Sequence, residues 1–228
     1  MKALLWKDYR INRSLLAFAA LLVAGPFFAV LVINRYAQFR YDQLVWPWPS
    51  ALVNTGTFSL AFHLVTIAML GGVAVAAERA DRSAEFLAYL PPSRRAIITS
   101  KAILAVSAML LICAVEVAVM YGLAPRIGPI PEGLVDFRDK LTPVLIPTAV
   151  LIFGAAWLGS SLLTSHSFAT GVGVAAPIAL VGVLAAVAYF LDLRGFFDLG
   201  AWYKLLCIPL GVLCFAAGVV YYLHRVEP

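Results

Sequence analysis

Charged residues are scarce in this sequence. Only 13% of its 228 residues are Asp, Glu, Lys or Arg, whereas 63% are hydrophobic, and the formal net charge is +5. A soluble domain carries roughly a quarter charged residues and about half apolar ones. The shortage therefore excludes an ordinary water-soluble domain and favours a chain surrounded by lipid. Since the basic residues flank apolar runs and form no basic face, they indicate membrane orientation rather than nucleic-acid binding.

Motifs for catalysis, metal binding and ATP hydrolysis are also missing. The sequence has no His-Glu-x-x-His or Gly-x-Ser-x-Gly pattern and no Gly-x-x-x-x-Gly-Lys-Ser/Thr phosphate loop. The three cysteines, Cys113, Cys207 and Cys214, lie inside apolar runs without the paired spacing of a metal site or a disulfide framework. We therefore expect no catalytic residues, no bound metal and no cofactor in this chain.

Long apolar runs dominate what is present. Six of them are long enough to cross the membrane, since a helix needs roughly 20 residues to span about 30 Å of hydrocarbon. Helix is the expected form because lipid offers no hydrogen-bonding partner to a bare peptide group. The sequence thus predicts an all-α integral membrane protein, a bundle of six transmembrane helices in a single domain over residues 1–228. The predicted spans are Ser14–Ile33, Thr57–Ala77, Ala102–Ala124, Leu141–Leu163, Phe168–Leu191 and Leu205–Leu223.

Basic residues predict the orientation of these spans. More of them precede the first run than follow it: Lys2, Lys7, Arg10 and Arg13 against Arg35 and Arg40. Cytoplasmic segments of membrane proteins are enriched in Lys and Arg. The bias therefore favours a multi-pass protein of the cell membrane, inner or plasma, with both termini in the cytoplasm.

The segment between the second and third runs carries helix start and stop signals. Asp81 or Ser83 can cap a short helix. Three apolar residues then fall on one face at helical spacing: Phe86, Leu87 and Leu90. Pro91-Pro92 ends this helix because neither residue donates a backbone hydrogen bond, and Ser93 can cap the next helix. We expect a short cytoplasmic amphipathic helix, which either lies in the lipid headgroups or serves as a mechanical contact for a cytoplasmic partner.

Two stretches resemble ABC transporter permeases of the type-2, exporter class. The opening Met1-Lys2-Ala3-Leu4-Leu5-Trp6-Lys7-Asp8-Tyr9-Arg10 is similar to the amphipathic start of these permeases. The stretch from Glu78 to Lys101 resembles a further pattern of the family: an acidic residue, a short helix with Glu and Leu, a Pro, then Ser-Arg and a Lys that opens the third span. One departure is Ser83-Ala84, where the family often has Gly-Thr.

The resemblance implies a permease subunit of an ATP-driven exporter. Such a subunit forms the translocation pathway as a homodimer or heterodimer, with membrane lipids around it and separate ABC ATPase subunits beneath it. ATP hydrolysis would reside in that partner, so we expect this chain not to be an enzyme. The short helix would be the coupling helix, and the residues implied in coupling are Glu78, Ser83, Glu85, Phe86, Leu87, Leu90, Pro91, Arg94 and Arg95. A non-transporting scaffold or assembly factor and an intramembrane enzyme remain open as alternatives.

Two titratable residues, His63 and Glu116, lie well inside apolar runs. In the predicted orientation both lie roughly 9–12 Å below the outer ends of their spans. A lone carboxylate in hydrocarbon is costly, so we expect Glu116 to face the bundle interior and to lie near His63 or a hydroxyl. A neutral Glu116 that holds two helices together and a Glu116 that binds cargo or a proton are both compatible with the sequence. The hydroxyls of the spans, Ser160 among them, can bond their own helices.

Overall fold

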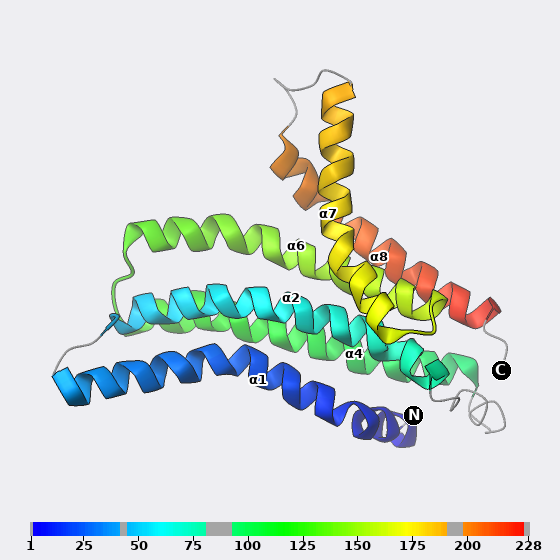
Figure 1. Ribbon diagram of the computed structural model, residues 1–228, viewed down its shortest axis with the longest axis horizontal. Helices are drawn as coiled ribbons and strands as arrows, with labels where there is room; N and C mark the ends of the chain where they lie inside the picture. Colours follow the sequence, from blue (N-terminus) through cyan, green and yellow to red (C-terminus); the bar gives the residue numbers. More distant parts are fainter. Residues whose placement is uncertain (1, 42–44, 81–92, 191–197, 226–228) are drawn as a thin grey trace. The chain divides into compact units, whose positions relative to one another are not determined.

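The computed structural model describes residues 2–41, 45–80, 93–190 and 198–225, and these ranges are helical throughout apart from short connections, without a strand (Figure 1). The helices are α1 (Lys2–Tyr41), α2 (Trp48–Ala80), α4 (Arg94–Val117), the π-helical turn η1 (Ala118–Leu123), α5 (Ala124–Ile127), α6 (Glu132–Leu162), α7 (His166–Phe190) and α8 (Leu199–Arg225).

Six stretches of this described chain are long and apolar enough to cross a membrane, judged by length and composition: Asn12–Tyr41, Trp48–Ala76, Arg94–Ile127, Glu132–Leu162, His166–Phe190 and Leu199–His224. Each of the six predicted runs falls within one of them, to within a residue or so at its ends. The prediction of an all-α protein with six membrane-spanning helices is therefore confirmed. The helices are longer than the runs because polar residues at both ends continue the helical backbone.

The α6–α7 junction is as short as the sequence predicts. Helix α6 ends at Leu162 and α7 begins at His166. Ser165 caps the second helix, since its hydroxyl accepts the N–H of Phe168 at 3.5 Å and its carbonyl accepts the N–H of Ala169 at 3.1 Å. Two separate helices therefore replace what could have been one very long one.

The chain forms two compact units. Unit 1 comprises Met1–Ile11, Ile67–Val106 and Ile146–Pro228, and unit 2 comprises Asn12–Thr66 and Ser107–Leu145. The sequence predicts a single transmembrane domain and does not reveal this division, because the long helices α1, α2, α4 and α6 each contribute residues to both units.

Within unit 1, glycines allow α6 and α8 to pack backbone against backbone. A Cβ atom added to Gly211 of α8 would lie 2.5 Å from the carbonyl oxygen of Val150 on α6, and one added to Gly154 would collide with the carbonyl of Gly211. Close approach at small residues is the usual way for helices to pack in lipid, where the hydrophobic effect does not drive them together. Beside the crossing lies a cluster of aromatic rings, with centroids 4.9–5.9 Å apart: Phe153, Trp157 and Phe215.

The distribution of side chains is the reverse of that in a soluble protein. Large apolar side chains are exposed, with Phe39 91% and Phe190 81% accessible, whereas His63 and Glu116 are 0% accessible. A helix surface of this kind is stable against lipid, and polar groups then face the interior or one another. The exposed apolar surface thus agrees with the membrane-spanning character of the six helices.

Candidate functional site

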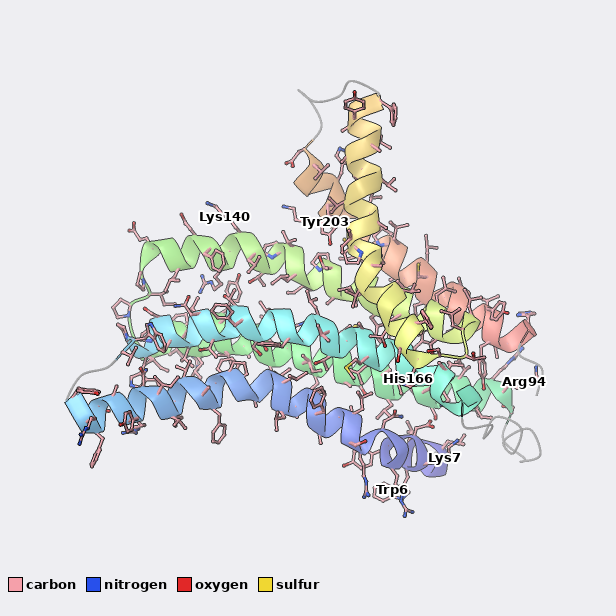
Figure 2. All side chains as sticks on the ribbon, in the orientation of Figure 1. Trp6, Lys7, Arg94, Lys140, His166 and Tyr203 are labelled. Carbon is pink, nitrogen blue, oxygen red and sulfur yellow. The ribbon has the colours of Figure 1, made fainter. Side chains whose placement is uncertain are left out.

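Most of the residues implied in ATPase coupling lie outside the described residues: Ser83, Glu85, Phe86, Leu87, Leu90 and Pro91. The short helix predicted between the second and third spans falls in the same gap. The backbone of Glu78 belongs to α2, near its end at Ala80. Arg94 and Arg95 form the exposed first turn of α4, with Arg94 at its start (Figure 2).

The predicted cap of α4 is confirmed. The hydroxyl of Ser93 accepts the N–H of Ala96 at 3.3 Å, and its carbonyl accepts the N–H of Ile97 at 3.1 Å. This capping satisfies backbone N–H groups that have no partner inside the first turn of a helix. Helix α4 therefore begins immediately after Pro91-Pro92, as the sequence predicts.

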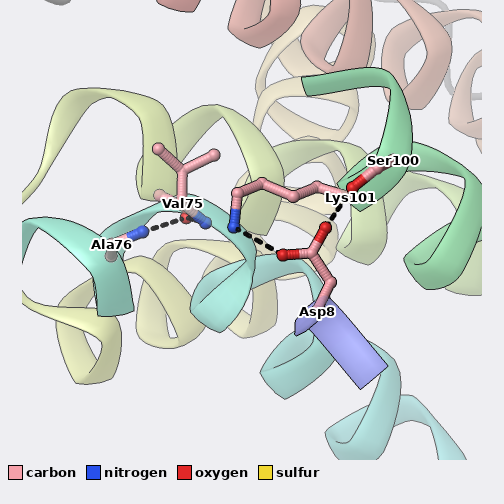
Figure 3. A network of polar contacts seen from close by, with 6 residues as sticks. Asp8, Val75, Ala76, Ser100 and Lys101 are labelled. Carbon is pink, nitrogen blue, oxygen red and sulfur yellow. Dashed lines mark hydrogen bonds and ion pairs between the residues drawn. The ribbon is translucent and has the colours of Figure 1, made fainter. Parts of the chain in front are cut away.

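A buried polar junction in unit 1 joins the first helix to α4. The hydroxyl of Ser100 donates to one carboxylate oxygen of Asp8, and the ammonium group of Lys101 lies 3.7 Å from the other (Figure 3). Both charged side chains are nearly inaccessible, at 5% and 3%. Sequence reasoning included Asp8 only as one letter of the N-terminal stretch. A single acidic residue among four basic ones was the signal that could have identified it.

A second polar contact in unit 1 joins α2 to α6. The hydroxyl of Ser160 accepts the N–H groups of Val75 at 2.8 Å and Ala76 at 2.9 Å (Figure 3). The sequence allowed Ser160 to bond its own helix but did not reveal that its oxygen accepts from α2. Its neighbour Ser161 does bond its own helix, donating to the carbonyl of Trp157 at 3.1 Å. Which of two adjacent hydroxyls faces another helix depends on helix phase, which the sequence does not show.

His63 and Glu116 lie on one contact between α2 and α4 in unit 2, as predicted, but they pair with different residues. The hydroxyl of Ser59 is hydrogen-bonded to Oε1 of Glu116, which confirms the expected hydroxyl partner. One turn along, Nε2 of His63 lies 3.8 Å from Sγ of Cys113. Oε2 of Glu116 and Nδ1 of His63 are buried without a hydrogen-bond partner among the described residues.

A third helix completes this contact. The hydroxyl of Ser59 also lies 2.9 Å from the carbonyl oxygen of Val23 on α1, to which it can donate. Val23 lies in the turn before Pro26, the proline inside α1, whose missing N–H leaves the carbonyl of Leu22 without its helical donor. Ser59 therefore stands between a backbone carbonyl of α1 and the carboxyl group of α4. Val23, Ser59 and Glu116 are called the Ser59 bridge below.

The helix changes its winding directly after Glu116. Residues Ala118–Leu123 form the π-helical turn η1, and the N–H of Ala124 donates to the carbonyl of Val119, five residues back. In this pattern the carbonyl of Met120 would need the N–H of Pro125, which a proline lacks. The guanidinium group of Arg138 on α6 replaces it, donating to that carbonyl at 3.2 Å.

Arg138 is held in place by two further contacts in unit 2. Its guanidinium carbon lies 4.2 Å from the ring centroid of Tyr121, and its Nε donates to Asp139 at 2.8 Å. Sequence reasoning missed Arg138 because it lies outside the predicted spans, where a basic residue is ordinary. Pi-helical turns inside α-helices are frequent at functional sites, so the neighbourhood of Glu116 is the candidate site of this unit.

A metal centre finds no support in the described ranges, where no group of three or more His, Cys, Asp or Glu side chains could hold an ion. Around Glu116 the described side chains bring together one carboxyl group, one hydroxyl, one imidazole and one thiol. Such groups exchange and hold protons. Comparison of the chain with family models, with curated proteins and with solved structures found no match.

Proposed function

We propose that this chain is the membrane-spanning permease subunit of an ATP-driven exporter, acting as a dimer with separate ATPase subunits. The observation that carries the proposal is the buried contact of Asp8 with Ser100 and Lys101, called the Asp8 junction below. It ties together the two stretches that resemble type-2 permeases, because Asp8 belongs to the N-terminal stretch whereas Ser100 and Lys101 end the second one. A buried ion pair costs desolvation energy, and removing one of its partners is strongly destabilising.

This junction supplies a route for mechanical coupling within unit 1. The segment 81–92 links the end of α2 at Ala80 to the start of α4 at Arg94. A partner that binds the segment therefore acts on both helices through covalent bonds. Asp8 extends the connection to the start of α1. The three helices would then respond together to ATP binding and hydrolysis in the partner.

The test is co-purification with an ATPase encoded by a neighbouring gene, together with measurement of its ATP turnover. Replacing both Phe86 and Leu87 with Ala should weaken association, since truncating an interface anchor commonly costs on the order of 1–4 kcal/mol. Phe190→Ala is the matched control because this side chain is 81% exposed on α7. Unchanged association and turnover in the double variant would remove the coupling role. A scaffold, in contrast, would bind its partner without altering ATP turnover.

A further inference from the structure

The two hydrogen bonds of the Ser59 bridge require two hydrogens. Ser59 carries one hydroxyl hydrogen, yet its oxygen contacts two oxygens, one from Val23 and one from Glu116. If Glu116 were ionised, both would be acceptors and one hydrogen would have to serve the two. A protonated Glu116 resolves the count, because its O–H donates to Ser59 and Ser59 donates to the carbonyl of Val23.

Burial supports the same assignment. Glu116 is completely inaccessible, and its second oxygen, Oε2, has no donor among the described residues. An ionised carboxylate in such surroundings would be an uncompensated buried charge, which is far more costly than a neutral acid with one free acceptor. The other titratable side chains shown at this contact are His63 from α2 and Cys113 from α4, while Arg138 of α6 lies at the π-helical turn that follows. The hydrogen bonds of Arg138 go to Met120 and Asp139.

The contact also has the means to open. Oε2 of Glu116 lies 3.9 Å from the position that a Cβ atom of Gly56 would take. Because Gly56 has no side chain, none stands between this oxygen and the backbone of α2 at that position. On the other side, the π-helical turn after Glu116 has its free carbonyl held by a side chain of α6 instead of by the helix itself. Rewinding this turn into an α-helix would move the N–H of Ala124 from the carbonyl of Val119 to that of Met120, where it would displace Arg138.

We propose that Glu116 and Ser59 form a proton-binding site in unit 2, and that release of the proton opens the contact between α2 and α4. With the proton bound, the Ser59 bridge closes the contact among α1, α2 and α4. Without it, the charge on Glu116 requires water or a new donor, and α4 moves at its π-helical turn to supply one. This inference does not depend on the permease proposal, because it concerns only contacts inside unit 2.

Infrared spectroscopy of the protein in liposomes tests the bound proton. The wild type should show the carbonyl stretch of a protonated carboxylic acid at pH 7, sensitive to D₂O and absent in Glu116→Gln. Glu132→Gln is the matched control, since Glu132 lies exposed in the first turn of α6. In Ser59→Ala the band should remain and move to higher frequency, because the acid loses its acceptor. Identical spectra for the wild type and Glu116→Gln in this region would overturn the proposal.

Cys113 reports on opening, because it lies one turn from Glu116 on the same contact. With Cys207 and Cys214 replaced by Ser, labelling of Cys113 by a thiol reagent is measured as the pH is raised. At high pH the labelling rate of Cys113 should be at least about tenfold higher in the wild type than in Glu116→Gln, in which no charge can form. The reason is that an unpaired buried charge costs more than the one hydrogen bond that keeps the contact closed. Parallel rates in the two proteins, or a carboxylic acid band that persists at every pH, would leave a permanently neutral Glu116 and refute release. A response to Na⁺ at constant pH would assign the site to a metal cation instead.

Discussion

At the scale of single residues, Arg138 shows how a side chain replaces a missing backbone donor. The carbonyl of Met120 lies at a π-helical turn whose next donor would be Pro125. A buried carbonyl without a partner costs about 1–3 kcal/mol. Two residues of the sequence therefore complement each other: Pro125 removes a backbone N–H, and Arg138 of α6 supplies a donor in its place.

The stability lost on removing Arg138 should depend on whether Pro125 is present. Arg138→Met should lower the free energy of unfolding by about 1–3 kcal/mol, because the carbonyl of Met120 loses its donor. In a Pro125→Ala background the loss should be smaller, since an alanine there would offer an N–H at the position that the π-helical pattern requires. Thermal unfolding in detergent gives the coupling through a double-mutant cycle. Arg126→Met, an exposed neighbour, serves as the control, and strictly additive losses would contradict the argument.

The sequence predicted the hydroxyl partner of Glu116 because a carboxyl group in lipid needs one. It did not predict that the hydroxyl is Ser59 or that His63 pairs with Cys113. Those choices depend on the rotation of two helices about their axes. The contact with the carbonyl of Val23 was still less predictable, since it requires the packing of a third helix.

At the scale of helices, the crossing of α6 and α8 depends on two glycines. Gly211→Ala should destabilise unit 1 by about 1–3 kcal/mol, because the added methyl group meets the backbone of α6 and the helices must separate. Gly182→Ala on α7 is the matched control, since no atom lies within 4 Å of the position that its Cβ would take. Thermal unfolding of the two variants measures the difference. Equal midpoints would show that the crossing is not tightly packed.

The Asp8 junction predicts non-additive behaviour between α1 and α4. Asp8→Ala should cost about 3–5 kcal/mol, because removing one member of a buried ion pair is strongly destabilising. Combining it with Lys101→Met should restore part of that loss, since the remaining charge is removed together with its partner. The free energies of unfolding of both single variants and the double variant are compared. A double variant as unstable as the sum of the singles would exclude a direct interaction.

Helix positions were predictable from the sequence because apolar runs of about 20 residues have few alternatives in lipid. The ends were not, since polar residues extend each helix beyond its run. The turn η1 was also missed. Its winding follows from Pro125 and from a partner on α6, and neither signal lies in the apolar pattern of the third run.

At the scale of the whole molecule, the predicted orientation can be tested by cysteine labelling in intact cells. With the native cysteines replaced, an impermeant reagent should label Trp46→Cys and Glu132→Cys, which are exposed positions at the outer connections. It should not label Ala88→Cys, because residues 78–101 are predicted to lie in the cytoplasm. Labelling at position 88 would reverse the topology. Positions 49–51 and 53 are unsuitable reporters, since they are buried in the first turns of α2.

The Ser59 bridge has a consequence for biosynthesis. Its members come from α1, α2 and α4 in the order in which a ribosome makes them. The carbonyl of Val23 and the hydroxyl of Ser59 are therefore already in the membrane when the segment bearing Glu116 leaves the ribosome. A carboxyl group within a nascent helix opposes the partition of that helix into lipid. The carbonyl of Val23 and the hydroxyl of Ser59 are thus inserted before the carboxyl group of Glu116, which then meets its hydrogen-bonding partners in the membrane.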